Sequence, residues 1–211
     1  MASRPKTAQP RPTPRFYLLT PDVTDAAAFA SALGPVLEAA DVAAVLLRLA
    51  EADERTQINR VKAIAPLAQD KGIALLLDGH AGLVARGGAD GAHLTGIEAF
   101  SEALETLKPD WIAGAGGLRS RHDTMTAAET GADYVMVGDR GEAADAERIG
   151  WLAEVLELPC VAFARSADEI APLVTAGADF IAVDYVWNDA SGAAAALTAA
   201  AQHMRLPETA A

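Results

Sequence analysis

The chain has 211 residues, of which 51% are hydrophobic, and this is enough for one domain with a full core. No stretch approaches the roughly 18 consecutive apolar residues that a membrane-spanning helix needs, so we expect a soluble protein without a membrane partner. The single cysteine, Cys160, excludes an intrachain disulfide, and no close pair of histidines suggests a structural zinc site. These features favour a reducing, cytoplasmic setting.

The charge is distributed unevenly along the chain. Residues 1–15 contain Arg4, Lys6, Arg11 and Arg15 and no acid, whereas the remainder carries 13 basic and 29 acidic residues, a formal −16. Such an acidic body repels a nucleic acid duplex, so we expect no nucleic acid partner. The first fifteen residues also hold four of the eleven prolines without apolar periodicity, which predicts a disordered, basic, Pro-rich leader. A transit peptide is the alternative, although the prolines argue against an amphipathic helix.

A tripeptide of two small residues and an aspartate recurs before four short apolar runs. The copies are residues 39–41, 88–90, 131–133 and 177–179, and they precede VAAVLLR, GAHL, YVMVG and FIAVD. Successive aspartates are 49, 43 and 46 residues apart. Each copy follows an Ala-rich stretch of helical pattern, and the glycine that opens the last three copies supplies the positive φ that ends a helix.

Four further apolar runs lie between these copies. Together they predict eight strands, at residues 16–20, 42–48, 73–77, 91–94, 111–114, 134–137, 160–163 and 180–183. Strands that alternate with helical patterns indicate parallel βαβ units, and near-continuous apolar strands indicate a sheet covered on both faces. We therefore predict an α/β fold in which residues 16–205 form a single compact (β/α)8 barrel, with a last helix over 190–203 and a tail at 206–211. An open doubly wound sheet is the structural alternative.

In such barrels the ligand site lies on the loops that follow the strands. The residues in these positions are Arg48, Asp78, His80, His93, Thr95, Glu98, Gly116, Gly117, Arg119, Arg121, His122, Asp139, Arg140, Arg165, Ser166, Asp184, Tyr185, Trp187 and Asn188. Several arginines on the rim of an acidic protein favour an anionic ligand, and ordinary solvated arginines are the alternative.

With the strands placed, the chain resembles the thiamin phosphate synthase and TenI family. FYLLT (16–20) is similar to that family's first strand, VLLR (45–48) to its Val-Gln-Leu-Arg strand, GADGAHL (88–94) to its fourth strand and GADYVMVG (131–138) to its sixth. The resemblance implies a TIM barrel that joins a hydroxymethylpyrimidine diphosphate to a thiazole phosphate and releases pyrophosphate. Its partners would be these small phosphorylated heterocycles, with Mg²⁺ as cofactor, and a homo-oligomer is compatible with it.

The resemblance also implies roles for individual residues. Arg48 matches the family's pyrophosphate-binding arginine, and His93 stands where the family keeps a histidine, so we expect both in the catalytic pocket. Asp78 lies one place from the family's magnesium aspartate and Glu98 matches its second metal carboxylate. The remaining phosphate or substrate contacts are expected from Gly116, Gly117, Arg119, Arg140, Arg165, Ser166 and Tyr185.

Several family residues are replaced in this chain. The lysine two positions after Arg48 is Ala50, the magnesium aspartate itself is Gly79, and the glycine pair after the seventh strand is Ala164-Arg165. The family's Thr-x-x-Lys loop is replaced by DRGEAADAE (139–147). These changes leave two alternatives open: an impaired relative that binds a thiamin-pathway phosphate or a partner, and a TenI-like thiazole isomerase.

Some rim residues have a structural interpretation beside the functional one. His93 is expected to fill the mouth of the barrel or to contact a ligand, and Tyr185 and Trp187 to cap the barrel or to stack on a heteroaromatic ring. His122 is expected on the surface. Cys160, at the start of a buried strand, is expected in the core.

Overall fold

The computed structural model describes residues 12–139 and 142–205. Most of the expected leader, the expected tail and Arg140 lie outside these residues. Arg15, which the leader was expected to include, belongs to the first strand, and Pro14 before it is buried.

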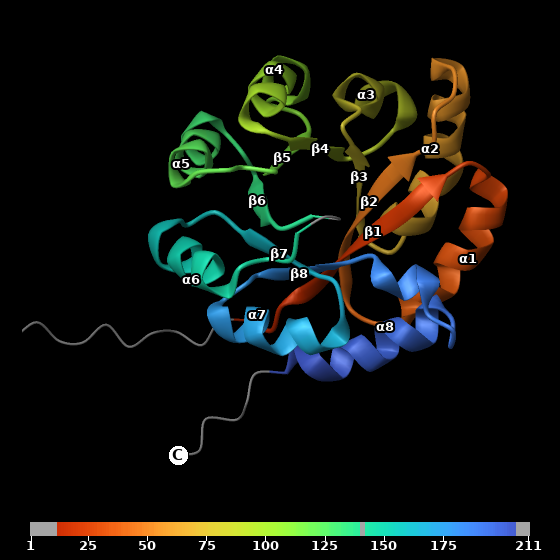
Figure 1. Ribbon diagram of the computed structural model, residues 1–211. Coiled ribbons are helices and arrows are strands. Elements are labelled where there is room, and N and C mark those ends of the chain that lie inside the picture. The colour runs from red at the N-terminus through yellow and green to blue at the C-terminus, as the bar shows by residue number, and fades with distance from the viewer. Residues whose placement is uncertain (1–11, 140–141, 206–211) are drawn as a thin grey trace, which may run out of the picture.

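The described residues form a closed barrel of eight parallel strands, in which each strand pairs with the next and the last pairs with the first (Figure 1). The strands are β1 (Arg15–Val23), β2 (Val42–Leu49), β3 (Ala74–Asp78), β4 (Gly91–Thr95), β5 (Ile112–Gly116), β6 (Tyr134–Val137), β7 (Cys160–Ala164) and β8 (Phe180–Val183). The predicted barrel is therefore confirmed, and the open sheet is not formed.

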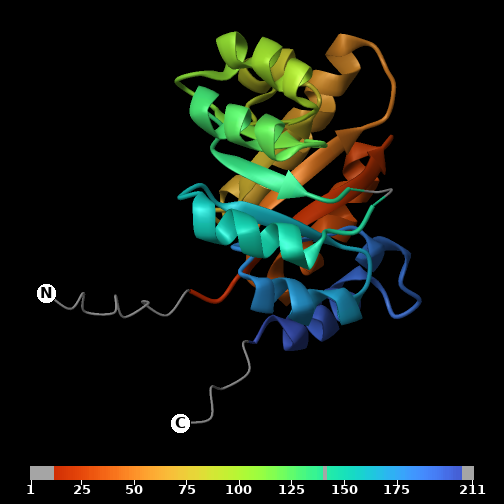
Figure 2. The same cartoon turned by 60° about the vertical axis from the view of Figure 1, so that its left-hand side comes forward.

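Helices cover the outside of the barrel (Figures 1 and 2). They are α1 (Ala26–Ala39), α2 (Glu54–Gln69), α3 (Val84–Gly87), α4 (Ile97–Leu107), α5 (Arg121–Thr130), α6 (Ala146–Val155), α7 (Ile170–Ala176) and α8 (Ala193–Ala201). The last helix is shorter than the predicted 190–203, and it packs against α1, so the outer ring closes. Within the described segments, none of the helices is both long and apolar enough to cross a membrane.

The core has two parts because successive strand residues point to opposite faces of the sheet. The larger part fills the space between sheet and helices and includes Leu18, Val45 and Leu75. The smaller part fills the inside of the barrel and consists of Tyr17, Leu19, Ala44, Leu46, Leu76, Tyr134, Met136, Val161, Phe163 and Ala182.

The repeated aspartates join neighbouring strands at the start of each strand pair. The Asp90 carboxylate accepts a hydrogen bond from the Leu75 N–H at 2.7 Å, and the Asp90 N–H donates to the Leu75 carbonyl at 2.8 Å. Asp133 makes the same pair of contacts with Ala113, at 2.7 and 2.9 Å, and Asp179 makes them with Cys160, at 2.8 and 3.0 Å. One aspartate thus satisfies both backbone groups of a residue on the preceding odd-numbered strand.

The glycine that opens three of the copies ends a helix, as the sequence indicated. Gly88, Gly131 and Gly177 follow α3, α5 and α7 with φ values of 78°, 115° and 103°. The first copy has Ala39 instead, and its Asp41 carboxylate accepts from the Arg15 side chain rather than from a strand N–H. The repeat is therefore a helix stop followed by a strand clamp, and only the first copy lacks both parts among the described residues.

Replacing Asp90 with alanine should destabilise the barrel by about 1–2 kcal/mol, because the buried Leu75 N–H loses its acceptor. Asp41→Ala is the matched control, since the Asp41 side chain is 72% exposed and pairs with an Arg15 side chain that is 43% exposed. Chemical denaturation of both variants measures the effect. Equal midpoints for the two variants would contradict the clamp.

Candidate functional site

Arg48 lies at the mouth of the barrel and bridges three strands. Its N–H donates to the Thr20 Oγ1 at 2.9 Å, and its Nε donates to an oxygen of Asp78 at 3.0 Å. Its Nη1 lies 3.4 Å from an oxygen of Asp184, which follows β8. The Arg48 side chain is 8% exposed, whereas those of Asp78 and Asp184 are 30% and 26% exposed. The guanidinium is therefore held rigidly, with two carboxylates on its solvent side.

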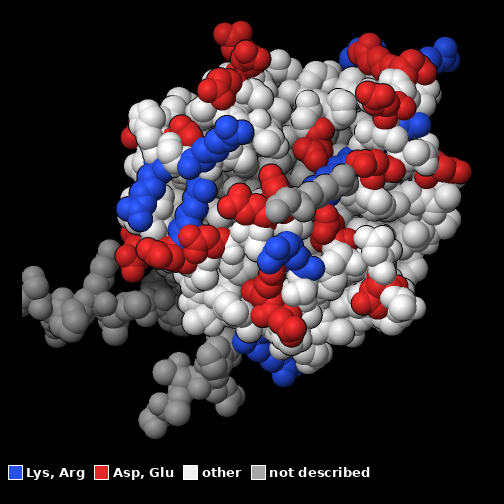
Figure 3. All heavy atoms as spheres, viewed as in Figure 1, with Lys and Arg blue, Asp and Glu red and all other residues white. Residues whose placement is uncertain are grey.

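Figure 3 shows acidic side chains around the centre of this face of the molecule, with basic side chains among them. At the mouth, one buried arginine, Arg48, is shared by two aspartates, so acidic groups outnumber basic ones there. Within the described residues, the second oxygen of each of these carboxylates accepts no hydrogen bond. Those two oxygens are open to solvent or to a cation.

His93, in β4, stands beside Asp78 in the neighbouring strand and is 4% exposed. Its Nδ1 lies 3.0 Å from the Tyr134 hydroxyl, and its ring stacks on the Tyr134 ring at 5.6 Å. Burial lowers the pKa of His93 from 6.5 to about 4, with Asp78 raising it and Arg48 lowering it. The imidazole is therefore neutral at pH 7. It stands at the mouth of the barrel, a position that is compatible with both sequence interpretations.

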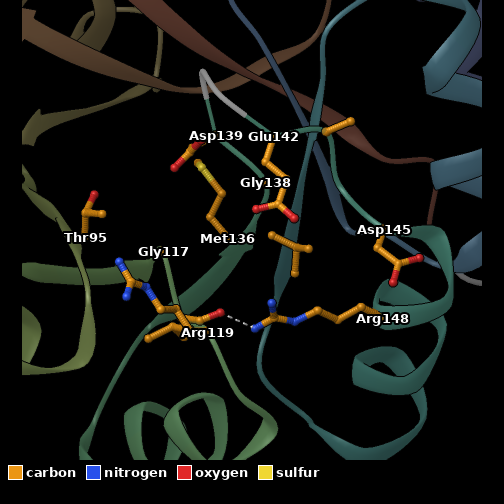
Figure 4. Close-up of a pocket in the computed structure, with 12 residues that line it drawn as sticks. Thr95, Gly117, Arg119, Met136, Gly138, Asp139, Glu142, Asp145 and Arg148 are labelled. Carbon is orange, nitrogen blue, oxygen red and sulfur yellow. Dashed lines mark hydrogen bonds between the residues drawn. The ribbon is translucent and has the colours of Figure 1, made fainter.

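A pocket of about 510 Å³ opens beside this mouth, over the ends of β4, β5 and β6. Figure 4 shows Arg119 entering it from the loop after β5, on the same side as Thr95. The pocket is lined by Thr95, Gly117, Leu118, Arg119, Met136, Val137, Gly138, Asp139, Glu142, Ala143, Asp145 and Arg148. It combines two arginines with three acids, so its two sides differ in charge.

The two arginines of this pocket are held differently. Arg148, on α6, donates to the Leu118 carbonyl at 2.7 Å and to the Thr124 Oγ1 at 3.0 Å, so it reinforces the pocket wall. The Arg119 N–H donates to the Asp123 carboxylate, which also caps α5. The Arg119 guanidinium itself makes no hydrogen bond or ion pair within the described residues, and it remains available to an anion.

Arg165, after β7, is already paired. Its Nε and Nη2 donate to one oxygen of Glu169 at 3.1 and 2.7 Å, and its N–H donates to the other oxygen at 2.7 Å. The Glu169 carboxylate thus takes up the donors that were expected to meet a phosphate. Hydrogen bonding to Arg165 lowers the pKa of Glu169, so this carboxylate stays ionised at neutral pH. Ser166 is exposed beside this pair.

The other aromatic and titratable residues of the rim have structural places. The Trp187 Nε1 donates to the Leu19 carbonyl at 2.7 Å, and the Trp187 ring packs on Phe29, so Trp187 caps the barrel. The Tyr185 hydroxyl is buried without a hydrogen-bond partner in the described part of the chain. His122 is exposed, and Cys160 lies in the core, where burial raises its pKa to about 12.

The family model for thiamine monophosphate synthase matches residues 16–184. The chain belongs to the thiamine monophosphate synthase family. A thiamine-phosphate synthase of Rhodospirillum centenum is 41% identical over 194 residues, covering 87% of this chain and 94% of the relative. A thiamine-phosphate synthase of Hyphomonas neptunium is 40% identical over 209 residues, covering 92% and 95%.

Solved structures agree with the fold. A thiamine phosphate pyrophosphorylase from Pyrococcus furiosus superposes with a TM-score of 0.76 at 21% identity, covering 90% of this chain and 95% of that one. An orotidine 5'-phosphate decarboxylase from Pyrococcus horikoshii gives 0.67 at 17% identity, covering 90% and 99%. At these identities the likeness concerns the fold alone, and the family assignment comes from the sequence matches.

Of the residues expected in the site of a thiamine monophosphate synthase family member, the structure brings Arg48 and Asp78 into contact and sets His93 on the next strand. Glu98 lies exposed in the first turn of α4, without a contact to Asp78 among the described residues. Gly116 is covered by the His93 ring, because a side chain there would meet the His93 Nε2 at 2.5 Å. Gly116 therefore makes room for the histidine rather than for a phosphate.

Sequence reasoning missed four residues that shape the site: Tyr17, Tyr134, Arg148 and Glu169. Tyr17 and Tyr134 sit in apolar strand runs, and the alternation of inward and outward positions was the signal that their hydroxyls face the barrel interior. Arg148 and Glu169 lie on the helical side of their loops. No motif marks either residue.

Arg48→Ala should destabilise the protein by about 2 kcal/mol, because Asp78 and Asp184 then lie near each other without the shared cation. Adding Asp78→Asn to Arg48→Ala should recover part of this loss, since one of the two like charges is gone. Thermal and chemical unfolding of the single and double variants measure the coupling. Strictly additive effects would contradict a shared ion pair.

Proposed function

We propose that this chain joins a hydroxymethylpyrimidine diphosphate to a thiazole phosphate, producing thiamin phosphate and pyrophosphate. Two relatives that carry the name thiamine-phosphate synthase are 40–41% identical and match over nearly their whole length, which supports this activity. The observation that carries the proposal is Arg48. It is buried, permanently charged and fixed at the centre of the mouth, where a diphosphate needs a cation.

The reaction breaks the bond between the pyrimidine methylene carbon and the diphosphate oxygen. The electron pair leaves with pyrophosphate, and the resulting pyrimidine-methyl cation is captured by the lone pair of the thiazole nitrogen, which forms the new C–N bond. No proton has to move in these two steps. The main task of the protein is therefore to stabilise the negative charge on the leaving group and to exclude water from the cation.

Magnesium is proposed as the cofactor, and the donor set fits it. Mg²⁺ takes oxygen ligands and usually binds through one or two carboxylates together with substrate phosphates and water. Asp78, with one oxygen not engaged by Arg48, and Glu98, in the first turn of α4, would hold it. When bound, the ion would offset charge on the diphosphate. Arg48 keeps the Asp78 carboxylate oriented toward the mouth whether or not a metal is present.

The phosphate of the thiazole partner is proposed to bind through arginines in place of the family's glycine pair and lysine. The Arg119 guanidinium is unpaired within the described residues, and the guanidinium fork can contact two phosphate oxygens at once. Arg165 offers a second fork, but a phosphate has to displace Glu169 from it. Arg140, outside the described residues, stays a proposed contact, as do Gly117, Ser166 and Tyr185.

The two alternatives receive less support. A thiazole isomerase needs an acid or base after β5, where the register of this chain places Arg119, and a guanidinium does not lose its proton in proteins. The nearest histidine, His122, is exposed on α5. A non-catalytic relative is less supported because the relatives at 40–41% identity carry the name thiamine-phosphate synthase. We also propose a cytoplasmic setting, since the cysteine is buried and unpaired.

The purified protein mixed with both phosphate substrates and Mg²⁺ should form thiamin phosphate and pyrophosphate. Arg48→Gln should lower kcat/KM at least a hundred-fold, because a charge-assisted contact to the leaving group is lost. Arg55→Ala, on an exposed face of α2, is the matched control and should leave the rate unchanged. Absence of product with the wild-type protein would favour the non-catalytic alternative.

Arg165→Ala should weaken binding of thiamin phosphate roughly ten- to a hundred-fold, by loss of a charge-assisted contact. Glu169→Gln should strengthen it, because the neutral amide competes less well for the guanidinium. Calorimetric titration of these variants, with Arg55→Ala as control, measures both effects. If Arg165→Ala binds as tightly as the wild type and Arg119→Ala does not, the phosphate is held by the pocket after β5 instead.

A further inference from the structure

A column of three hydrogen-bonded side chains runs along the inside of the barrel. The Tyr17 hydroxyl, from β1, lies 2.6 Å from the Tyr134 hydroxyl, from β6. The Tyr134 hydroxyl in turn lies 3.0 Å from the Nδ1 of His93, from β4. Tyr17, Tyr134 and His93 are 2%, 6% and 4% exposed, so the column is enclosed by the strands. It links the apolar interior to the mouth of the barrel.

Two glycines of β5 make space for this column. A side-chain carbon at Gly114 would lie 2.0 Å from the Tyr134 ring, and one at Gly116 would lie 2.5 Å from the His93 Nε2. These two positions face the interior on alternate residues of the strand. Glycine at positions 114 and 116 is therefore needed for the two rings to stack.

The direction of the hydrogen bonds follows from counting protons. Among the described residues, the Tyr17 hydroxyl has the Tyr134 hydroxyl as its one partner, and a buried donor without an acceptor is unfavourable. Tyr17 must then donate to Tyr134. Tyr134 has a single proton left to give and one remaining partner, the His93 Nδ1. Nδ1 is consequently an acceptor, and in a neutral imidazole the proton resides on Nε2.

The other ring nitrogen, Nε2, lies at the carboxyl end of β5. The His93 Nε2 has no hydrogen-bond partner in the described part of the chain. In that part of the chain, the Tyr185 hydroxyl is the one buried side-chain polar atom without a hydrogen-bond partner. Since Nε2 also lacks a partner but is not among the buried atoms, solvent reaches it. It lies against Gly116, the last residue of β5, level with the end of the strand.

We propose that Tyr134 is a positioning residue that fixes His93 in its Nε2–H tautomer, so that His93 presents a hydrogen-bond donor to an acceptor atom of the bound ligand. Tyr17 completes the arrangement because its hydroxyl donates to the Tyr134 oxygen, which leaves the Tyr134 proton for His93. The identity of the ligand rests on the proposed function, whereas the tautomer is a property of the ligand-free protein. The two can therefore fail separately.

Nuclear magnetic resonance of protein labelled with ¹⁵N-histidine tests the tautomer directly, through the shifts and the ring-proton correlations of the two nitrogens. The His93 signals are assigned by their loss in His93→Gln. We expect a neutral ring at pH 7.5 with the proton on Nε2 in the ligand-free wild type. A proton on Nδ1 in the wild type would overturn the proposal without recourse to any variant.

Two single-hydroxyl variants then locate the cause. Tyr134→Phe removes the donor to Nδ1, and we expect the His93 signals to move toward a mixture of tautomers. Tyr17→Phe is the matched control, because it removes one hydroxyl from the same column yet leaves Tyr134 able to donate, so the Nε2–H form should persist. An unchanged spectrum in Tyr134→Phe, or an equal change in both variants, would show that the Tyr134 proton does not set the tautomer.

Discussion

The clamps that three of the repeated aspartates make with the preceding odd-numbered strands fix how the strands that carry the site are aligned. Parallel strands have no tight turn to set their register, so side-chain contacts at the strand starts have to do it. Asp90, Asp133 and Asp179 each bind both backbone groups of one residue on the preceding strand. With the starts of the strands aligned in this way, the ends of β3, β4 and β8 bring Asp78, His93 and Asp184 to one mouth.

Space inside the barrel imposes the second constraint. Two tyrosine rings and an imidazole occupy the interior, and β5, which lies between the strands of His93 and Tyr134, needs small residues where these two rings lie against it. Gly114 and Gly116 meet this requirement on β5. Glycine weakens a strand interior, and pairing of β5 with strands on both sides offsets part of that cost. The space left by these glycines lets the hydrogen bonds among Tyr17, Tyr134 and His93 extend from the core to the mouth of the barrel.

Much of the fold could be predicted from the sequence, because the repeat has a direct physical meaning: a glycine stops a helix, an aspartate clamps a strand, and an apolar run fills the core. Eight strands and their order followed from it. Individual contacts were harder to predict. The pairing of Arg165 with Glu169 depends on a short helical turn, and the hydrogen bond between Tyr17 and Tyr134 joins β1 to β6 across the inside of the closed barrel. Such contacts join residues that no local pattern relates.

Arg48 and Arg165 make two different kinds of contact with carboxylates, and the two kinds suit different roles. Arg48 is buried between two partly buried carboxylates, so its position does not depend on a ligand. Arg165 is 56% exposed, and its contact with Glu169 lies in high dielectric, where an ion pair is weak and is readily exchanged. Under the proposed function, a substrate phosphate would have to displace Glu169 from Arg165. Exchange of the Glu169 carboxylate for a substrate phosphate at Arg165 would let a protein with a net charge of −12 bind an anionic substrate without a further positive charge at that loop.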